Sequence, residues 1–287
     1  MSRLRGQLEM NNLPCVLTIA GTDPSGGAGI QADIKAISAN NCYAASVITA
    51  LVAQNTTGVQ AIEKVSPEFL LQQLNSVFSD LDISAVKIGM LHNELAVEIV
   101  ASTLEKVRQK NIVLDPVMVA KNGCALLDTN KITYLKERLF PIVDLITPNL
   151  FETEKLLGRK TETLKEMEFA AQELGKMYDI NVLVKGGHLD SDQSTDVLYL
   201  AATASFHWFH AKRIHTKNTH GTGCTLSSAI AAYLAHGFSL PKAIKAAKDY
   251  LTNAILAGSL EKIGNGSGPV NHFYFLESLN HDICTNE

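Results

Sequence analysis

Short apolar runs alternate with longer amphipathic segments along most of the chain. The short runs predict six buried strands at Cys15–Ala20, Ser46–Leu51, Ala85–Ile88, Ile112–Leu114, Val143–Ile146 and Val182–Val184. Between them, apolar residues recur three or four positions apart, which predicts helices around 30–37, 69–78, 95–104, 132–139 and 163–178. Strands and helices that alternate in this way form a mainly parallel sheet covered by helices on both faces.

The C-terminal third departs from this alternation. Thr195–Leu200 and Ser205–His210 predict an antiparallel pair at one edge of the sheet, and helices follow at about Gly223–His236 and Pro241–Leu260. No linker rich in Ser, Pro or Gly divides the chain. We therefore expect one α/β domain over residues 1–287, with residues 1–12 as a flexible N-terminal extension.

Composition narrows the class of protein. Apolar residues make up 46% of the 287 positions, charged residues 19%, and the net charge is −4, which favours a globular protein without the basic face that binds nucleic acid. The first residues lack the apolar core of a secretory signal, and the longest apolar run, 44–53, is half of the ~20 residues that span a bilayer. We expect a cytoplasmic protein without a membrane segment.

The segment Asn218–Thr225 joins a glycine turn to the start of a predicted helix. Gly221 and Gly223 lie where unpaired backbone N–H groups and the helix dipole favour a phosphate or a developing oxyanion. Cys224 falls in the first turn, where the same field lowers the pKa of a thiol. The alternative is an ordinary glycine turn with Cys224 packed as a small apolar residue. The five cysteines, odd in number and without C-x-x-C spacing, predict neither a disulfide framework nor a zinc site.

Polar or glycine-rich segments follow each of the six predicted strands. In a doubly wound sheet, ligands bind beyond the carboxyl ends of the strands. These segments are 21–29, 54–58, 89–90, 115–118, 147–149 and 185–188. Lys185 ends a buried Val-Leu-Val strand, and a charge in that position predicts an anionic partner. The pattern predicts one site built from many loops.

These loops could form one of three kinds of nucleotide site. The G-x-x-x-x-G-K-[ST] pattern of P-loop proteins is absent. Gly27–Ala32 fits the dinucleotide pattern G-x-G-x-x-A, but the acidic residue that should follow ~20 positions further on is missing, since the next acid in that region is Glu63. This absence argues against a dehydrogenase. The third arrangement places phosphates at the C-terminal glycine loop and a second, small substrate at the N-terminal loop.

The segments in this third arrangement resemble, in order, the hydroxymethylpyrimidine/phosphomethylpyrimidine kinases of thiamine biosynthesis, a vitamin-kinase branch of the ribokinase-like fold. The resemblance spans roughly residues 13–275 and rests on 17–33, 47–56, 87–91, 145–150, 185–188 and 216–226. It implies a ribokinase-like three-layer fold, with a mainly parallel central sheet flanked by helices. It also implies a kinase that uses ATP and Mg²⁺, with a monovalent cation as a further candidate cofactor, and a homodimer.

The resemblance also implies residue roles. The substrate would be a small molecule, 4-amino-5-hydroxymethyl-2-methylpyrimidine and then its monophosphate, bound by Asp33 and Gln54 and enclosed by Gly21, Ala28, Met90 and Val117. Mg²⁺ would be held through water by Glu152 and Asp115, with Asn149 beside it. The nucleotide phosphates would meet Lys185, Thr216, Thr222 and the amides of Gly221 and Gly223. Cys224 would stand where sugar-kinase relatives carry an Asp base.

Two alternatives remain open from the sequence. The first is a pyridoxal/pyridoxine kinase, although Gln54 with Met90 favours the aminopyrimidine. The second is a non-catalytic vitamer-binding protein, against which the presence of Lys185, Asn149, Glu152 and Cys224 argues.

Overall fold

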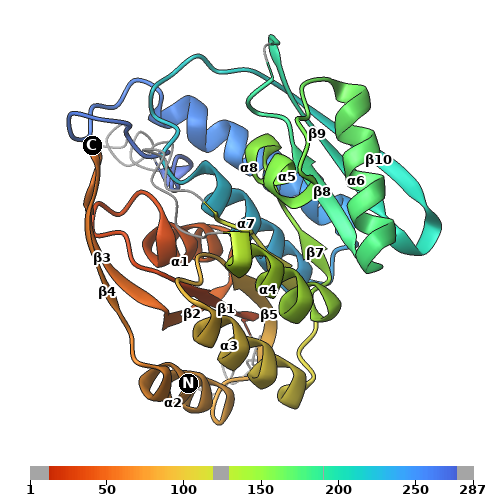
Figure 1. Cartoon of the computed structure of the whole chain (residues 1–287). Coiled ribbons are helices and arrows are strands. Elements are labelled where there is room, and N and C mark those ends of the chain that lie inside the picture. Colours follow the sequence, from red (N-terminus) through yellow and green to blue (C-terminus); the bar gives the residue numbers. More distant parts are fainter. Residues whose placement is uncertain (1–12, 119–128, 190, 277–287) are drawn as a thin grey trace, which may run out of the picture.

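An eight-stranded sheet forms the centre of the molecule (Figure 1). The computed structural model describes residues 13–118, 129–189 and 191–276. The strand order is β10-β9-β8-β7-β6-β5-β1-β2, and only β9 runs antiparallel to its neighbours. The strands are β1 (Cys15–Ala20), β2 (Tyr43–Ile48), β5 (Ile83–Ile88), β6 (Ile112–Leu114), β7 (Leu145–Ile146), β8 (Asn181–Lys185), β9 (Gln193–Leu200) and β10 (Ser205–Lys212). The expected edge pair is therefore confirmed as β9 and β10.

Helices cover both faces of this sheet. One face packs against α2 (Pro67–Phe78), α3 (Glu94–Val107), α4 (Thr129–Leu139), α5 (Leu150–Leu157) and α6 (Leu164–Tyr178). The other packs against α1 (Gly29–Ala39), α7 (Thr222–Ala235) and α8 (Leu240–Gly258). Within β1, Leu17 and Ile19 join the first core and Val16 joins the second, so the strand is apolar except for Thr18 because both its faces are buried. The predicted three-layer α/β fold is confirmed.

The predicted strand Ser46–Leu51 is wrong. The chain leaves the main sheet after Ile48, and β3 (Ala50–Asn55) pairs with β4 (Gly58–Lys64) in a separate antiparallel ribbon. This ribbon runs along one side of the molecule in Figure 1. Buried and exposed residues alternate at the start of β3, as in a strand that is covered on one face only. Gln54 therefore lies within the ribbon and does not follow a strand of the main sheet.

Other differences are smaller. The short helix α5 and the strand β4 were not predicted, and the remaining helices lie within a few residues of their expected positions. The N-terminal extension expected at residues 1–12 lies outside the described residues. None of the helices in the described part of the chain combines the length and the apolar character that crossing a bilayer requires.

Candidate active site

A cavity of about 1020 Å³ opens at the carboxyl ends of the parallel strands. Its walls come from the loops after β1, β5, β6, β7 and β8, from the β3–β4 ribbon, and from the starts of α5 and α7. Residues of α8, among them Leu251 and Ile255, line a further side. This volume is at the upper end of the range for single-ligand pockets, so it can accommodate a nucleotide together with a second small molecule.

The glycine turn before α7 forms one end of the cavity. Gly221 has a φ of +78°, and a Cβ atom at this position would lie 1.7 Å from the carbonyl oxygen of Gly27. Only glycine permits this backbone conformation together with such a close approach of the two loops. The turn and the first residues of α7 thus line the cavity, where the start of a helix can bind an anion.

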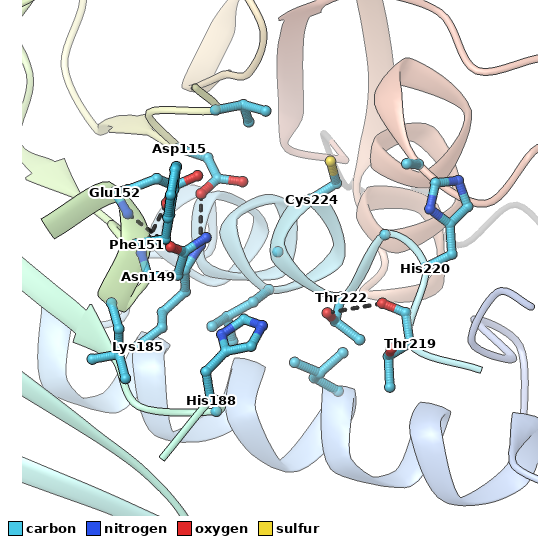
Figure 2. Close-up of a pocket in the computed structure, with 18 of the residues that line it drawn as sticks. Asp115, Asn149, Phe151, Glu152, Lys185, His188, Thr219, His220, Thr222 and Cys224 are labelled. Carbon is cyan, nitrogen blue, oxygen red and sulfur yellow. Dashed lines mark hydrogen bonds and ion pairs between the residues drawn. The ribbon is translucent and has the colours of Figure 1, made fainter. Parts of the chain in front are cut away.

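Lys185 and Asp115 face this turn. A Cβ atom at Gly223 would lie 3.4 Å from Lys185 Nζ and 3.3 Å from Asp115 Oδ2. Lys185 Nζ donates to Asp115 Oδ1 at 2.7 Å, and Thr147 Oγ1 donates to the same oxygen at 3.0 Å. Burial opposes ionisation of Asp115, but the charges of Lys185 and Lys87 outweigh it and lower the pKa of the carboxyl. Figure 2 shows Lys185 and Asp115 pointing toward one another beside α7.

Glu152 and Asn149 extend the site along the start of α5. The Asn149 side chain accepts from the Glu152 amide at 2.9 Å, and the Glu152 carboxylate accepts from the Asn149 amide at 2.8 Å. This reciprocal capping box holds both side chains at the cavity wall. Burial raises the pKa of Glu152 to about 7, against the opposing charge of Lys185. A further cation in the cavity would favour its ionised form.

Cys224 lies in the first turn of α7 and lines the cavity, as expected. The predicted lowering of its pKa is wrong. Burial raises the pKa of the thiol to about 11, and the carboxylates of Asp33 and Asp115 act in the same direction, whereas Lys87 opposes them. At neutral pH, Cys224 is therefore a thiol in the structure without ligands.

The substrate end of the cavity contains most of the residues expected there. Gly21, Ala28, Gln54, Met90 and Val117 all line it. A Cβ atom at Gly21 would lie 2.4 Å from Met90 Cε, so these two residues pack directly and narrow the pocket.

Asp33 and Thr216 do not take their expected positions. Asp33 is fully buried and does not line the cavity, because its carboxylate binds Lys87, Thr18 and Ser228. Its Oδ2 atom lies 2.8 Å from Lys87 Nζ, and Lys87 is the member of this pair that lines the cavity. Thr216 also lies outside the cavity wall, since its hydroxyl binds the carbonyl of Ser259 and the amide of Asn218.

The sequence analysis missed several charged residues of the cavity. Lys87 was predicted only as part of an apolar strand, and a lysine inside such a run was the available signal. Asp23 and His220 belong to the motifs quoted above but had no role. Asp196 and Lys248 form a buried ion pair at 2.5 Å beside Gly186, whose amide binds Asp196. Nothing local in the sequence indicates that pair, because its members are far apart in the chain.

Comparisons with known proteins agree with this geometry. A family model described as phosphomethylpyrimidine kinase matches residues 23–271. The chain is 49% identical over 259 residues to the hydroxymethylpyrimidine/phosphomethylpyrimidine kinase of Escherichia coli strain K12, a match that covers 90% of this chain and 97% of that protein. It is 48% identical over 264 residues to the thiamine biosynthesis bifunctional protein ThiED of Geobacter sulfurreducens, with 92% of this chain covered. The chain spans about half, 53%, of that longer relative.

Solved structures show the same architecture. The ADP complex of Bacillus subtilis pyridoxal kinase superposes with a TM-score of 0.85 and 34% identity, over 92% of this chain and 99% of that chain. Phosphomethylpyrimidine kinase from Clostridium difficile 630 superposes with a TM-score of 0.74 and 40% identity, over 84% of this chain and 99% of that chain.

Proposed function

The chain belongs to the phosphomethylpyrimidine kinase family, and on that premise we propose that it phosphorylates 4-amino-5-hydroxymethyl-2-methylpyrimidine with ATP and then phosphorylates the monophosphate. One observation carries this proposal. The Lys185 ammonium and the glycine turn of α7 meet in the same cavity as the small pocket around Gln54 and Met90. A phosphate donor and a small heteroaromatic alcohol can therefore be held together.

This arrangement matches the demands of phosphoryl transfer, which are mainly positioning and neutralisation of charge on the transferred group. Lys185 supplies a cation, and the amides of Gly221–Cys224 supply donors aligned with the positive end of the α7 dipole. Cys224 stands beside these donors as a neutral thiol. In a loose transition state the alcohol loses its proton late, so the thiol contributes by lining the oxyanion position and does not need to form thiolate first.

The residues near Lys185 also fit Mg²⁺. Asp115 and Glu152 supply carboxylate oxygens, which are the ligands that Mg²⁺ prefers, and this ion usually retains several waters and binds substrate phosphates. The described residues contain no cluster of three or more His, Cys, Asp or Glu side chains that could hold a metal ion. Mg²⁺ would neutralise charge on the phosphates, while Asn149 keeps Glu152 in place.

Pyridoxal is the second candidate substrate because pyridoxal kinases are among the nearest folds. Two relatives that each align over 90% of this chain, at 49% identity, are named instead for the pyrimidine. We therefore expect the pyrimidine to be the preferred substrate.

Turnover of the two alcohols tests the proposal. The purified protein would be incubated with ATP, MgCl₂ and either the pyrimidine alcohol or pyridoxine, and the product mass would be read for one or two added phosphates. We expect a diphosphorylated pyrimidine and a lower kcat/KM for pyridoxine. Dominant turnover of pyridoxine would replace the proposed substrate, and binding without ADP release would indicate a non-catalytic protein.

A further inference from the structure

His220 connects the two loops that enclose the cavity. It directly precedes Gly221, and its Nε2 atom lies 2.7 Å from Asp23 Oδ2 in the loop after β1. The two side chains are 12% and 2% exposed, so water competes little with this contact. Figure 2 shows His220 beside the glycine turn, on the side of Cys224 away from Lys185. It therefore lies toward the substrate end of the cavity.

Asp23 is held firmly as a hydrogen-bond acceptor. Its carboxylate accepts from the Ser25 amide at 2.9 Å, from the Ser25 hydroxyl at 2.7 Å and from the Ala28 amide at 2.7 Å. Burial opposes its ionisation, but the bonds from His220 and Ser25 outweigh burial and lower the pKa of Asp23 to about 2. An ionised carboxylate only accepts hydrogen bonds. The proton between the two residues therefore resides on His220 Nε2.

A hydrogen on His220 Nε2 limits how the Gln54 carboxamide can be oriented. The terminal carboxamide of Gln54 lies 3.3 Å from the same Nε2 atom, and its nitrogen is the atom drawn there. Two nitrogens that both carry hydrogen cannot bond to each other, whereas a carboxamide oxygen can share the single Nε2 hydrogen with Asp23, as the second and more distant acceptor of a three-centre bond. The oxygen and nitrogen of a carboxamide exchange places by a half-turn of the terminal group. The favourable arrangement has the Gln54 oxygen facing His220 and the NH₂ group facing the cavity.

We propose that His220, held by Asp23, is a positioning residue that orients the Gln54 carboxamide with its NH₂ group toward the substrate. The site then selects a heterocycle that presents an acceptor at that place, such as the ring nitrogen beside the amino group of the pyrimidine. This inference rests on the proposed function, because it concerns how the same site recognises its substrate. His220 itself does not touch the reacting atoms.

Kinetics of three variants test the inference. H220L removes the donor, whereas H220Q retains an N–H group at a similar reach. His215 is an exposed histidine of the same segment outside the cavity wall, and H215L is the matched control. We expect H220L to raise KM for the pyrimidine about tenfold while KM for ATP changes by about twofold or less. H220Q should recover most of the loss, and H215L should behave as wild type.

Equal rises in both KM values for H220L, or H220Q no better than H220L, would overturn the positioning role. Wild-type turnover is measured first, so failure of the proposed function is seen before any variant is compared.

NMR of the protein labelled with ¹⁵N-histidine gives a second test that needs no turnover. The spectra of the wild type and H220Q identify the His220 signals and report which ring nitrogen carries hydrogen. Hydrogen on Nε2, alone or with Nδ1, is expected. Hydrogen on Nδ1 alone would overturn the inference, even if H220L failed to fold.

Discussion

Cys224 lies where two electrostatic effects oppose each other. The field of the α7 N-terminus favours the thiolate, as the local sequence suggests. Burial and the carboxylates of Asp33 and Asp115 favour the thiol, and the pKa rises to about 11. Burial and these two carboxylates therefore outweigh the charge of Lys87, which favours the thiolate. Cys224 lies in the predicted site, but its ionisation state is determined by burial and by charged groups on other elements.

Substitutions at Cys224 and Lys185 should separate their roles. We expect C224A to lower kcat about tenfold or more with little change in KM for ATP, because the thiol lines the reacting end of the cavity. K185A should lower kcat and also raise KM for ATP, because it removes the cation beside the glycine turn. Steady-state kinetics measure both effects.

Cys42 supplies the control for the thiol. Cys42 lies in the short connection from α1 to β2, where it is buried and does not line the cavity. C42A should therefore retain the kcat of the wild type. Wild-type kcat in C224A would remove the Cys224 thiol from the chemistry.

At the scale of elements, α5 and α6 both begin with a capping box, but the two boxes lie in different surroundings. Asn149 and Glu152 form the capping box of α5 inside the cavity, whereas Thr163 and Glu166 form that of α6 on the surface. Both boxes satisfy two backbone N–H groups at a helix start. Only the first also holds a carboxylate beside Lys185.

Alanine variants of the two caps should therefore agree in stability and differ in activity. N149A and T163A should each lower the free energy of unfolding by about 1 kcal/mol, measured by urea denaturation. N149A should in addition raise KM for Mg·ATP, because Glu152 loses the partner that fixes its helix start. Equal activity of the two variants would show that the α5 cap has only a structural role.

At the scale of the whole molecule, the segment that follows α8 contacts the start of α7. The His220 amide donates to the carbonyl of Gly268, and His272 Nε2 lies 2.9 Å from Thr225 Oγ1. The Tyr250 hydroxyl of α8 donates to the His272 carbonyl at 2.9 Å. Burial, and then the charge of Lys35, lower the pKa of His272 to about 4. These contacts hold the glycine turn in place, and we expect them to contribute to the free energy of unfolding.

The depressed pKa of His272 makes stability depend on pH in a defined direction. Between pH 6.5 and about 4, the unfolded chain binds a proton at this position and the folded chain does not. Stability therefore falls as pH is lowered through this window. Compared with H272Q, the wild type should lose on the order of 2 kcal/mol more between pH 7.5 and pH 5. Urea denaturation at several pH values measures the difference, and parallel curves would contradict the prediction.

The sequence by itself determined the layers of the fold and part of the cavity wall. Cys15–Ala20 and Ile112–Leu114 form strands at their predicted bounds, because a strand buried on both faces is mostly apolar along its length. Gly221 and Gly223 indicated the anion turn, because a tight turn before a helix requires glycine. The family motifs then identified Gln54, Met90 and Val117, among other residues that line the cavity.

Only the tertiary structure decided what those residues contact. Asp33 forms an ion pair with Lys87, which is 54 positions away in the chain. No local sequence pattern therefore shows that Asp33 is buried behind the cavity wall. The break between β2 and β3 depends on where the main sheet ends, and apolar residues lie on both sides of it. The ionisation of Cys224 depends on burial and on charges from separate elements. Such long-range terms arise only when the chain is folded.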